Sequence, residues 1–165
     1  MASSTQGIVA LFENVPLLSA VFSFSLAQLF KFLLHYAKHG RWDVTRLWGS
    51  GGMPSSHTAF VTGLTMAVCL VEGTGSSSFA ISMVLTAITA YDATGVRQHA
   101  GRQASVINAL ITTLPPEHPV QDHEYAGKLR DQLGHTPLEV LMGGILGILV
   151  GILVHGISLA AGKTS

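Results

Sequence analysis

The sequence predicts an all-α integral membrane protein: a bundle of about four transmembrane helices plus short interfacial helices. Only 11% of the 165 residues are charged, whereas soluble domains carry about 25%. The mean hydropathy is +0.45. Apolar residues gather in four runs, and no run shows the alternation typical of a β-strand. The length suits a single membrane domain, 1–165, with a polar loop at 115–134.

The first apolar run, Val15 to Leu34, is long enough to cross a bilayer. Lys31 lies near its end and has two interpretations. It either extends to the lipid headgroups or faces inward as a phosphate-binding lysine. His35 and His39 follow at i+4 spacing, and we interpret them as a solvated interfacial pair rather than as metal ligands.

A basic, aromatic connection, Lys38 to Ser50, precedes the second helix. Its tryptophans, Trp42 and Trp48, are typical of interfacial anchors. The helix itself is expected from about Ser55 to Val71.

The start of the second helix has the composition of an anion site. Glycines precede it, Pro54 suits a first helical turn, and two hydroxyls follow at Ser55 and Ser56. Free N–H groups at a helix start bind anions, and His57 could transfer a proton. The alternative is an ordinary turn and cap with a surface histidine.

The third run, Phe79 to Tyr91, follows a turn of small residues at 72–78. The second and third runs are short for a bilayer. Extending them through Ser56–Thr58 and Asp92–Val96 places His57 and Asp92 at the membrane edge. Ionisable residues at that depth are costly and often functional.

Polar and charged residues follow the third run immediately. Arg97 and Arg102 carry guanidinium groups, which suit phosphate oxygens. The alternative is a basic patch that touches lipid headgroups, although that interpretation leaves Asp92 unexplained. We expect a short interfacial helix at 105–114 and a hydrophilic segment at 115–133 outside the membrane.

The last run opens with a capping box, in which Thr136 is the N-cap and Glu139 its partner. The box does not explain His135, which stands just outside the helix. The run continues to about Ala160, a clear span. Glycines at every fourth position predict close packing against another helix, and His155 continues their line: Gly143, Gly147 and Gly151.

Four spans place the loops 38–56 and 92–137 on one side of the membrane. That side holds all of the Lys and Arg residues except Lys163, so it is predicted to be cytoplasmic, stromal or matrix. The same topology gathers the polar residues of three segments at one face, an arrangement suited to phosphate chemistry: His57, Asp92, Arg97, Arg102 and His135. The net charge of zero gives no reason to expect a nucleic acid partner. Cys69 is expected to be a core residue.

Three motifs resemble a known family. Met53 to His57 is similar to the Pro-Ser-Gly-His motif of the type-2 phosphatidic acid phosphatases, relatives of the vanadium haloperoxidases. Gly134 to Val140 is similar to their His-x-x-x-Asp-Val motif. With the block Tyr91 to Ala104, these motifs resemble the divergent small membrane branch of that family, over about 17–156.

The resemblance implies a membrane phosphatase that hydrolyses a lipid phosphate monoester or diphosphate through a phosphohistidine. It implies that His135 is the nucleophile, oriented by Glu139, and that His57 protonates the leaving alcohol. It also implies no cofactor and no metal. We group Asp92 with the catalytic residues as the expected partner of an arginine. The phosphate-binding groups would be Lys31, Gly52, Ser55, Ser56, Arg97 and Arg102.

The chain also departs from the family pattern. The Arg-Pro pair is absent, with Arg46 the nearest candidate, and Ser56 replaces glycine. The Ser-Arg pair that should precede the second histidine is missing, because Arg130 is one residue too close to it and Leu129 stands where serine should be. Glu139 replaces aspartate. These departures favour the alternative: a catalytically inactive phosphatase-like membrane protein with a structural or lipid-binding or anion-binding role. The expected partners are a lipid phosphate and membrane lipids; a homo-oligomer or a membrane-complex partner stays open.

Overall fold

The computed structural model describes residues 10–44, 52–131 and 133–162. These residues form helices and turns and contain no strand, which confirms the all-α prediction. The elements are α2 (Val15–His39), α3 (Ser56–Glu72), α4 (Ser77–Thr94), α5 (Val96–Thr113), the 3₁₀ helix η2 (Pro119–Asp122) and α6 (Pro137–Ala160).

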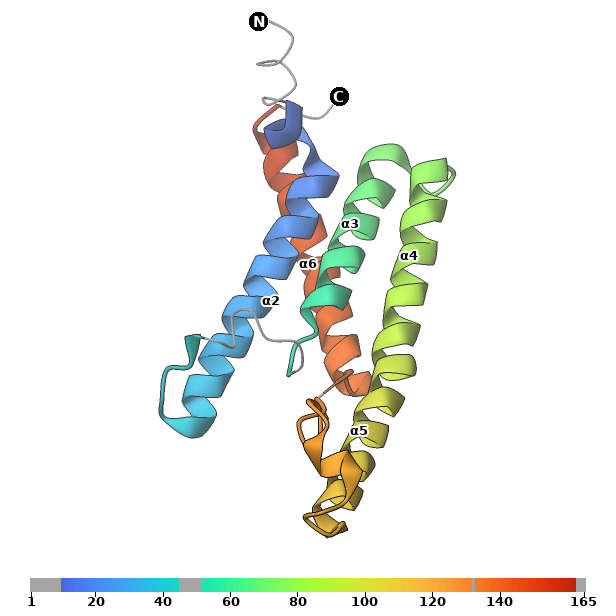
Figure 1. The fold of residues 1–165 in the computed structure, drawn as a ribbon. Helices are drawn as coiled ribbons and strands as arrows, with labels where there is room; N and C mark the ends of the chain where they lie inside the picture. Colours follow the sequence, from blue (N-terminus) through green and yellow to red (C-terminus); the bar gives the residue numbers. More distant parts are fainter. Residues whose placement is uncertain (1–9, 45–51, 132, 163–165) are drawn as a thin grey trace, which may run out of the picture.

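The helices run up and down, with α3 in the middle (Figure 1). Helix α3 packs against α2, α4 and α6, and α5 continues the line of α4 beyond the bundle. The C-terminal end of α2 and the N-terminal ends of α3 and α6 therefore lie at one end, with the start of α5. The start of α2 and the end of α6 lie at the other end, as the sequence predicts.

The glycine line of α6 makes the closest helix crossing. Gly143, Gly147 and Gly151 are all buried. A Cβ atom at Gly147 would overlap the Thr62 hydroxyl and the backbone of α3. The predicted packing role of the glycines is thus confirmed, and it fixes the start of α6 beside the start of α3. His155 is half-buried, and its Nδ1 atom has no hydrogen-bond partner among the described residues.

Three helical stretches are long and apolar enough to cross a membrane: Val15–His39, Ser77–Thr113 and Pro137–Ala160. Helix α3 is apolar but has 17 residues, the lower end of the roughly 17–25 residues that span a bilayer. As predicted, the helices extend over the polar positions at their ends, since α3 includes His57 and α4 includes Asp92.

Two boundary predictions are wrong. The polar segment after Asp92 is helical rather than a loop, because α5 begins at Val96, directly after Gly95, and buries one face through Gly101, Ala104 and Ile111. The interfacial helix expected at 105–114 corresponds only to the second half of α5.

Pro54 also stands before the second helix rather than in its first turn. Ser55 is the N-cap of α3, and its side chain accepts from the Thr58 N–H. The predictions for Arg46, Trp48, Gly51 and Lys163 fall outside the described residues.

Candidate phosphate site

The candidate site begins with a lysine inside the bundle. Lys31 is only 6% exposed, on the same inward face of α2 as the small residues that contact α3. Its Nζ atom donates to the Ser56 hydroxyl at 3.0 Å. The side chain therefore faces inward rather than extending to the headgroups, so one cation is fixed at the start of α3.

Two helix starts meet beside this lysine. The Ser55 N–H donates to the Glu139 carbonyl at 2.9 Å, which ties the N-cap of α3 to the first turn of α6. Each helix start carries a partial positive charge and unpaired N–H groups. Ser55 and Ser56 are almost completely buried. The convergence gives this end of the bundle a positive potential in addition to the charge of Lys31.

His135 is held by backbone hydrogen bonds to a different pair of helices. Its N–H donates to the Ala93 carbonyl at 2.9 Å, at the end of α4. Its carbonyl accepts from the Gln98 side chain at 3.3 Å, on α5. Gly134 has a φ of 82° and contacts the backbone of α5 so closely that a Cβ atom would overlap Gln98. The backbone at His135 is therefore fixed from both sides.

The described residues of the segment that leads to His135, 128–131 and 133–135, run back along α5, and we call them the strap. Asn108 pairs with Leu129 through two hydrogen bonds: the side-chain amide donates to the Leu129 carbonyl at 2.8 Å, and the side-chain oxygen accepts the Leu129 N–H at 3.2 Å. Gly101 leaves room for the strap backbone. Sequence reasoning missed Gln98 and Asn108, because their partners lie far along the chain.

The imidazole of His135 is buried and has a free nitrogen. The residue is 5% exposed, and its Nε2 atom has no hydrogen-bond partner among the described residues. Burial lowers the pKa of His135 from its ordinary value of 6.5, the positive charge of Lys31 lowers this pKa further, and Glu139 opposes the shift. The ring is thus neutral at pH 7, with an unshared nitrogen lone pair available for a ligand.

His57 lies in the first turn of α3 and is exposed, unlike His135. Its ring meets Phe24 edge-on, with 6.4 Å between the centroids. His57 is within electrostatic reach of Arg97, Lys31 and Asp92, and also of His135. The structure therefore brings the two histidines and Lys31 to the same end of the bundle.

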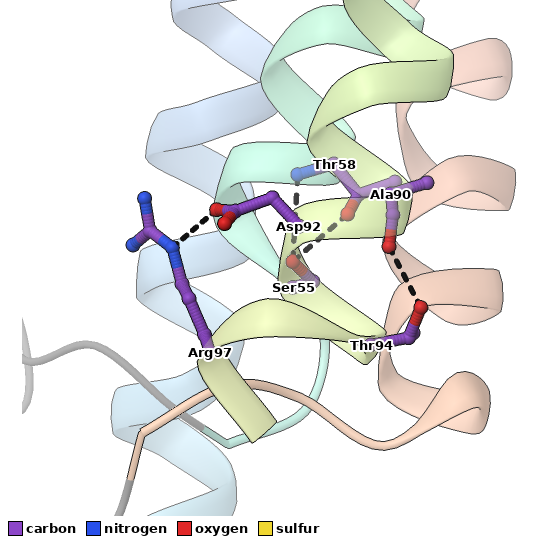
Figure 2. Close-up of polar contacts among 6 residues, drawn as sticks. All are labelled: Ser55, Thr58, Ala90, Asp92, Thr94 and Arg97. Atoms are coloured by element: carbon purple, nitrogen blue, oxygen red, sulfur yellow. Dashed lines mark hydrogen bonds and ion pairs between the residues drawn. The ribbon is translucent and has the colours of Figure 1, made fainter. Parts of the chain in front are cut away.

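Asp92 and Arg97 form an ion pair between the end of α4 and the start of α5. Figure 2 shows the guanidinium of Arg97 turned back toward Asp92, on the side of α4 where Ser55 and Thr58 form the cap of α3. The Arg97 side chain is 53% exposed. The predicted pairing of Asp92 with an arginine is present, at the edge of the site.

Three predicted site residues form no hydrogen bond with either histidine among the described residues: Arg102, Gly52 and Glu139. Arg102 is exposed on α5 and is not among the charged groups that act on His57 or His135. Gly52 is exposed, with a φ of 83°. The Glu139 carboxylate accepts the Thr136 N–H at 2.8 Å, completing the capping box. Glu139 thus acts on His135 through its charge and caps α6.

His35 and His39 lie at the far end of α2, with 4.5 Å between their ring centroids. His35 also approaches Asp43, at 3.9 Å. In the ranges that the structure describes, no group of three or more His, Cys, Asp or Glu side chains is arranged to hold a metal ion.

Comparison with known proteins agrees with this picture. The divergent PAP2 family matches residues 12–150. The uncharacterized membrane protein YuiD of Bacillus subtilis (strain 168) is 40% identical over 151 residues, covering 87% of this chain and 96% of that protein. No solved structure matches. Helices of membrane-spanning length and a family match over most of the sequence lead to one conclusion: the chain is a membrane protein that belongs to the divergent PAP2 family.

Proposed function

We propose that this protein is a membrane phosphatase that hydrolyses a lipid phosphate monoester or diphosphate through a phosphohistidine at His135. The observation that carries the proposal is the Nε2 atom of His135, which is buried and has no partner among the described residues. A buried polar atom normally has a hydrogen-bond partner. An unpartnered imidazole nitrogen within electrostatic reach of the buried Lys31 fits a nucleophile that attacks a bound phosphate.

The proposed reaction has two steps. In the first, Nε2 of His135 attacks phosphorus, the bond from phosphorus to the lipid oxygen breaks, and His57 donates a proton to the leaving alcohol. In the second, His57 takes a proton from water, whose oxygen attacks phosphorus and breaks the phosphorus–nitrogen bond. Inorganic phosphate leaves and both histidines return to their starting states.

The positive charge needed to stabilise the transferring group has a source in this fold. Lys31 and the starts of α3 and α6 converge at the site, and such preorganised charges stabilise phosphoryl transfer. We infer that they substitute for the Arg-Pro and Ser-Arg pairs that the sequence lacks. Arg97 adds to this charge only if it leaves Asp92.

A second candidate function is lipid phosphate binding without turnover. Two observations favour it: Arg97 is paired with Asp92, and the Glu139 carboxylate is occupied by the capping box. Both leave fewer groups for the transition state than the family pattern implies. Binding would then depend on Lys31 and the helix starts alone.

Phosphate release distinguishes the two functions. Purified protein in detergent or vesicles would be assayed against phosphatidate, phosphatidylglycerophosphate and a prenyl diphosphate. We expect release with at least one substrate, its loss in His135→Ala, and no change in His99→Ala, which replaces an exposed histidine of α5. Lipid phosphate binding by the wild type without release from any substrate would favour the second function.

We also propose that the end of the bundle that holds the site faces the cytoplasm, stroma or matrix. The support is the distribution of Lys and Arg along the chain. Cysteine labelling in sealed vesicles tests it, with single cysteines at Thr74 and Asp122 in a Cys69→Ala background. Labelling of both positions from one side would contradict this topology.

A further inference from the structure

An apolar groove begins at His57. It is lined by α2, α3 and α4 through Phe24, His57, Phe60, Val61 and Thr89, and its volume is about 360 Å³. Phe24 and Phe60 meet edge-on, with 6.0 Å between their ring centroids. The volume is near the lower end of the roughly 300–1,000 Å³ typical of small-molecule pockets, which suits one narrow hydrocarbon chain.

Hydrogen bonds between α3 and α4 hold one side of this groove in place. On α4, the Thr86 hydroxyl donates to the Val61 carbonyl at 3.2 Å and shares a 2.9 Å hydrogen bond with Thr65. Helix α4 is therefore fastened to α3 along the groove, while α2 flanks α3 on the other side (Figure 1). The groove is a feature of the fold rather than a gap between independent helices.

The groove lies among helices that cross the membrane, and its polar end is the candidate site. His57 is the residue that the two share, because it lines the groove and directly follows Ser56, whose hydroxyl accepts from Lys31. A molecule that fills both places must therefore be anionic at one end and apolar at the other. Membrane lipids with a phosphate headgroup have this chemistry, and the surrounding bilayer supplies them.

We propose that this groove, which we call the chain groove, binds one hydrocarbon chain of a lipid phosphate whose headgroup lies at Lys31 and Ser56. The inference rests on the proposed function for its kinetic consequence. It assigns a specificity role to Phe60 and Thr89, which line the groove together with His57. The chain enters sideways from the bilayer, so long-chain lipid phosphates are preferred over short-chain, water-soluble ones.

A substitution that fills the groove tests the preference. Thr89 is half-buried in the wall on α4, so Thr89→Trp places a large ring in the groove. We expect it to lower the ratio of kcat/KM for long-chain over short-chain phosphatidate about tenfold, since each excluded methylene loses a fixed transfer free energy. Ile81→Trp, at a 70% exposed position on the same helix, is the control and leaves the ratio unchanged. An unchanged ratio in Thr89→Trp would overturn the proposal.

Photolabelling tests the groove without relying on turnover. The His135→Ala protein in vesicles would be labelled with phosphatidate that carries a diazirine in one acyl chain, and with phosphatidylcholine that carries the same chain. We expect phosphatidate to label peptides that contain Phe24 and Phe60 more strongly than phosphatidylcholine does. Equal labelling by both lipids would mean a bystander lipid and would overturn the proposal. If the wild type releases no phosphate, the proposed function fails, but preferential labelling still supports the groove.

Discussion

The two histidines of the candidate site are held in contrasting ways. His135 is buried, and its backbone is bonded to α4 and α5, while its ring nitrogen is left free. His57 is exposed, lies in the first turn of α3, and contacts the Phe24 ring at one end of an apolar groove. A fixed, neutral imidazole suits attack on phosphorus, whereas an accessible imidazole suits proton exchange with a leaving group and with water.

Replacing each histidine with alanine tests this difference in roles most directly. His135→Ala should lower kcat by about 10³-fold or more, because the nucleophile is lost. His57→Ala should lower kcat by about 10²- to 10⁴-fold, the typical contribution of a general acid. With an activated aryl phosphate, which needs no protonation of the leaving group, His57→Ala should still accumulate phosphohistidine and His135→Ala should not. Acid-quench labelling with radioactive phosphate measures this; label in His135→Ala would refute the assignment.

The second prediction concerns the helix crossing that places both histidines at one end. Gly147→Leu should destabilise the protein by about 3 kcal/mol or more, because the side chain would overlap the backbone of α3. Gly156→Leu, on the same helix, is a matched control, since a Cβ atom there meets nothing within 4 Å. Thermal unfolding in detergent measures both. Equal stability of the two variants would contradict the packing described above.

Local and periodic features of this fold could be predicted from the sequence. The capping box at Thr136 and Glu139 depends on residues three apart, and the α6 glycines repeat every fourth position. The course of α5 could not be predicted, because its exposed polar residues resemble a loop and only its contact with the strap explains the buried face. The position of His135 depends on pairs such as Asn108 and Leu129, 21 residues apart, which no local pattern reveals.

The third prediction sharpens the role of the strap. Asn108→Ala removes both hydrogen bonds to Leu129 and should cost about 1–2 kcal/mol of stability. Because the strap ends at His135, we also expect kcat to fall about tenfold while KM changes little, the pattern of a misplaced nucleophile. Thr113→Ala, which removes a hydroxyl bonded only within α5, is the control. A loss of stability with unchanged kcat would show that the strap does not position the site.

The smallest expected effect is a dependence of stability on pH to which His135 contributes. Burial lowers its folded-state pKa below 6.5, so the unfolded chain binds more protons once the pH falls below that value. The folded protein should then lose stability as the pH falls, by at most about 1.4 kcal/mol per pH unit, until the folded-state pKa is reached. His135→Gln has no titrating group at this position and should lose less stability between pH 7 and pH 5. A decline that is identical in the wild type and His135→Gln would show that the buried imidazole is not the group that titrates.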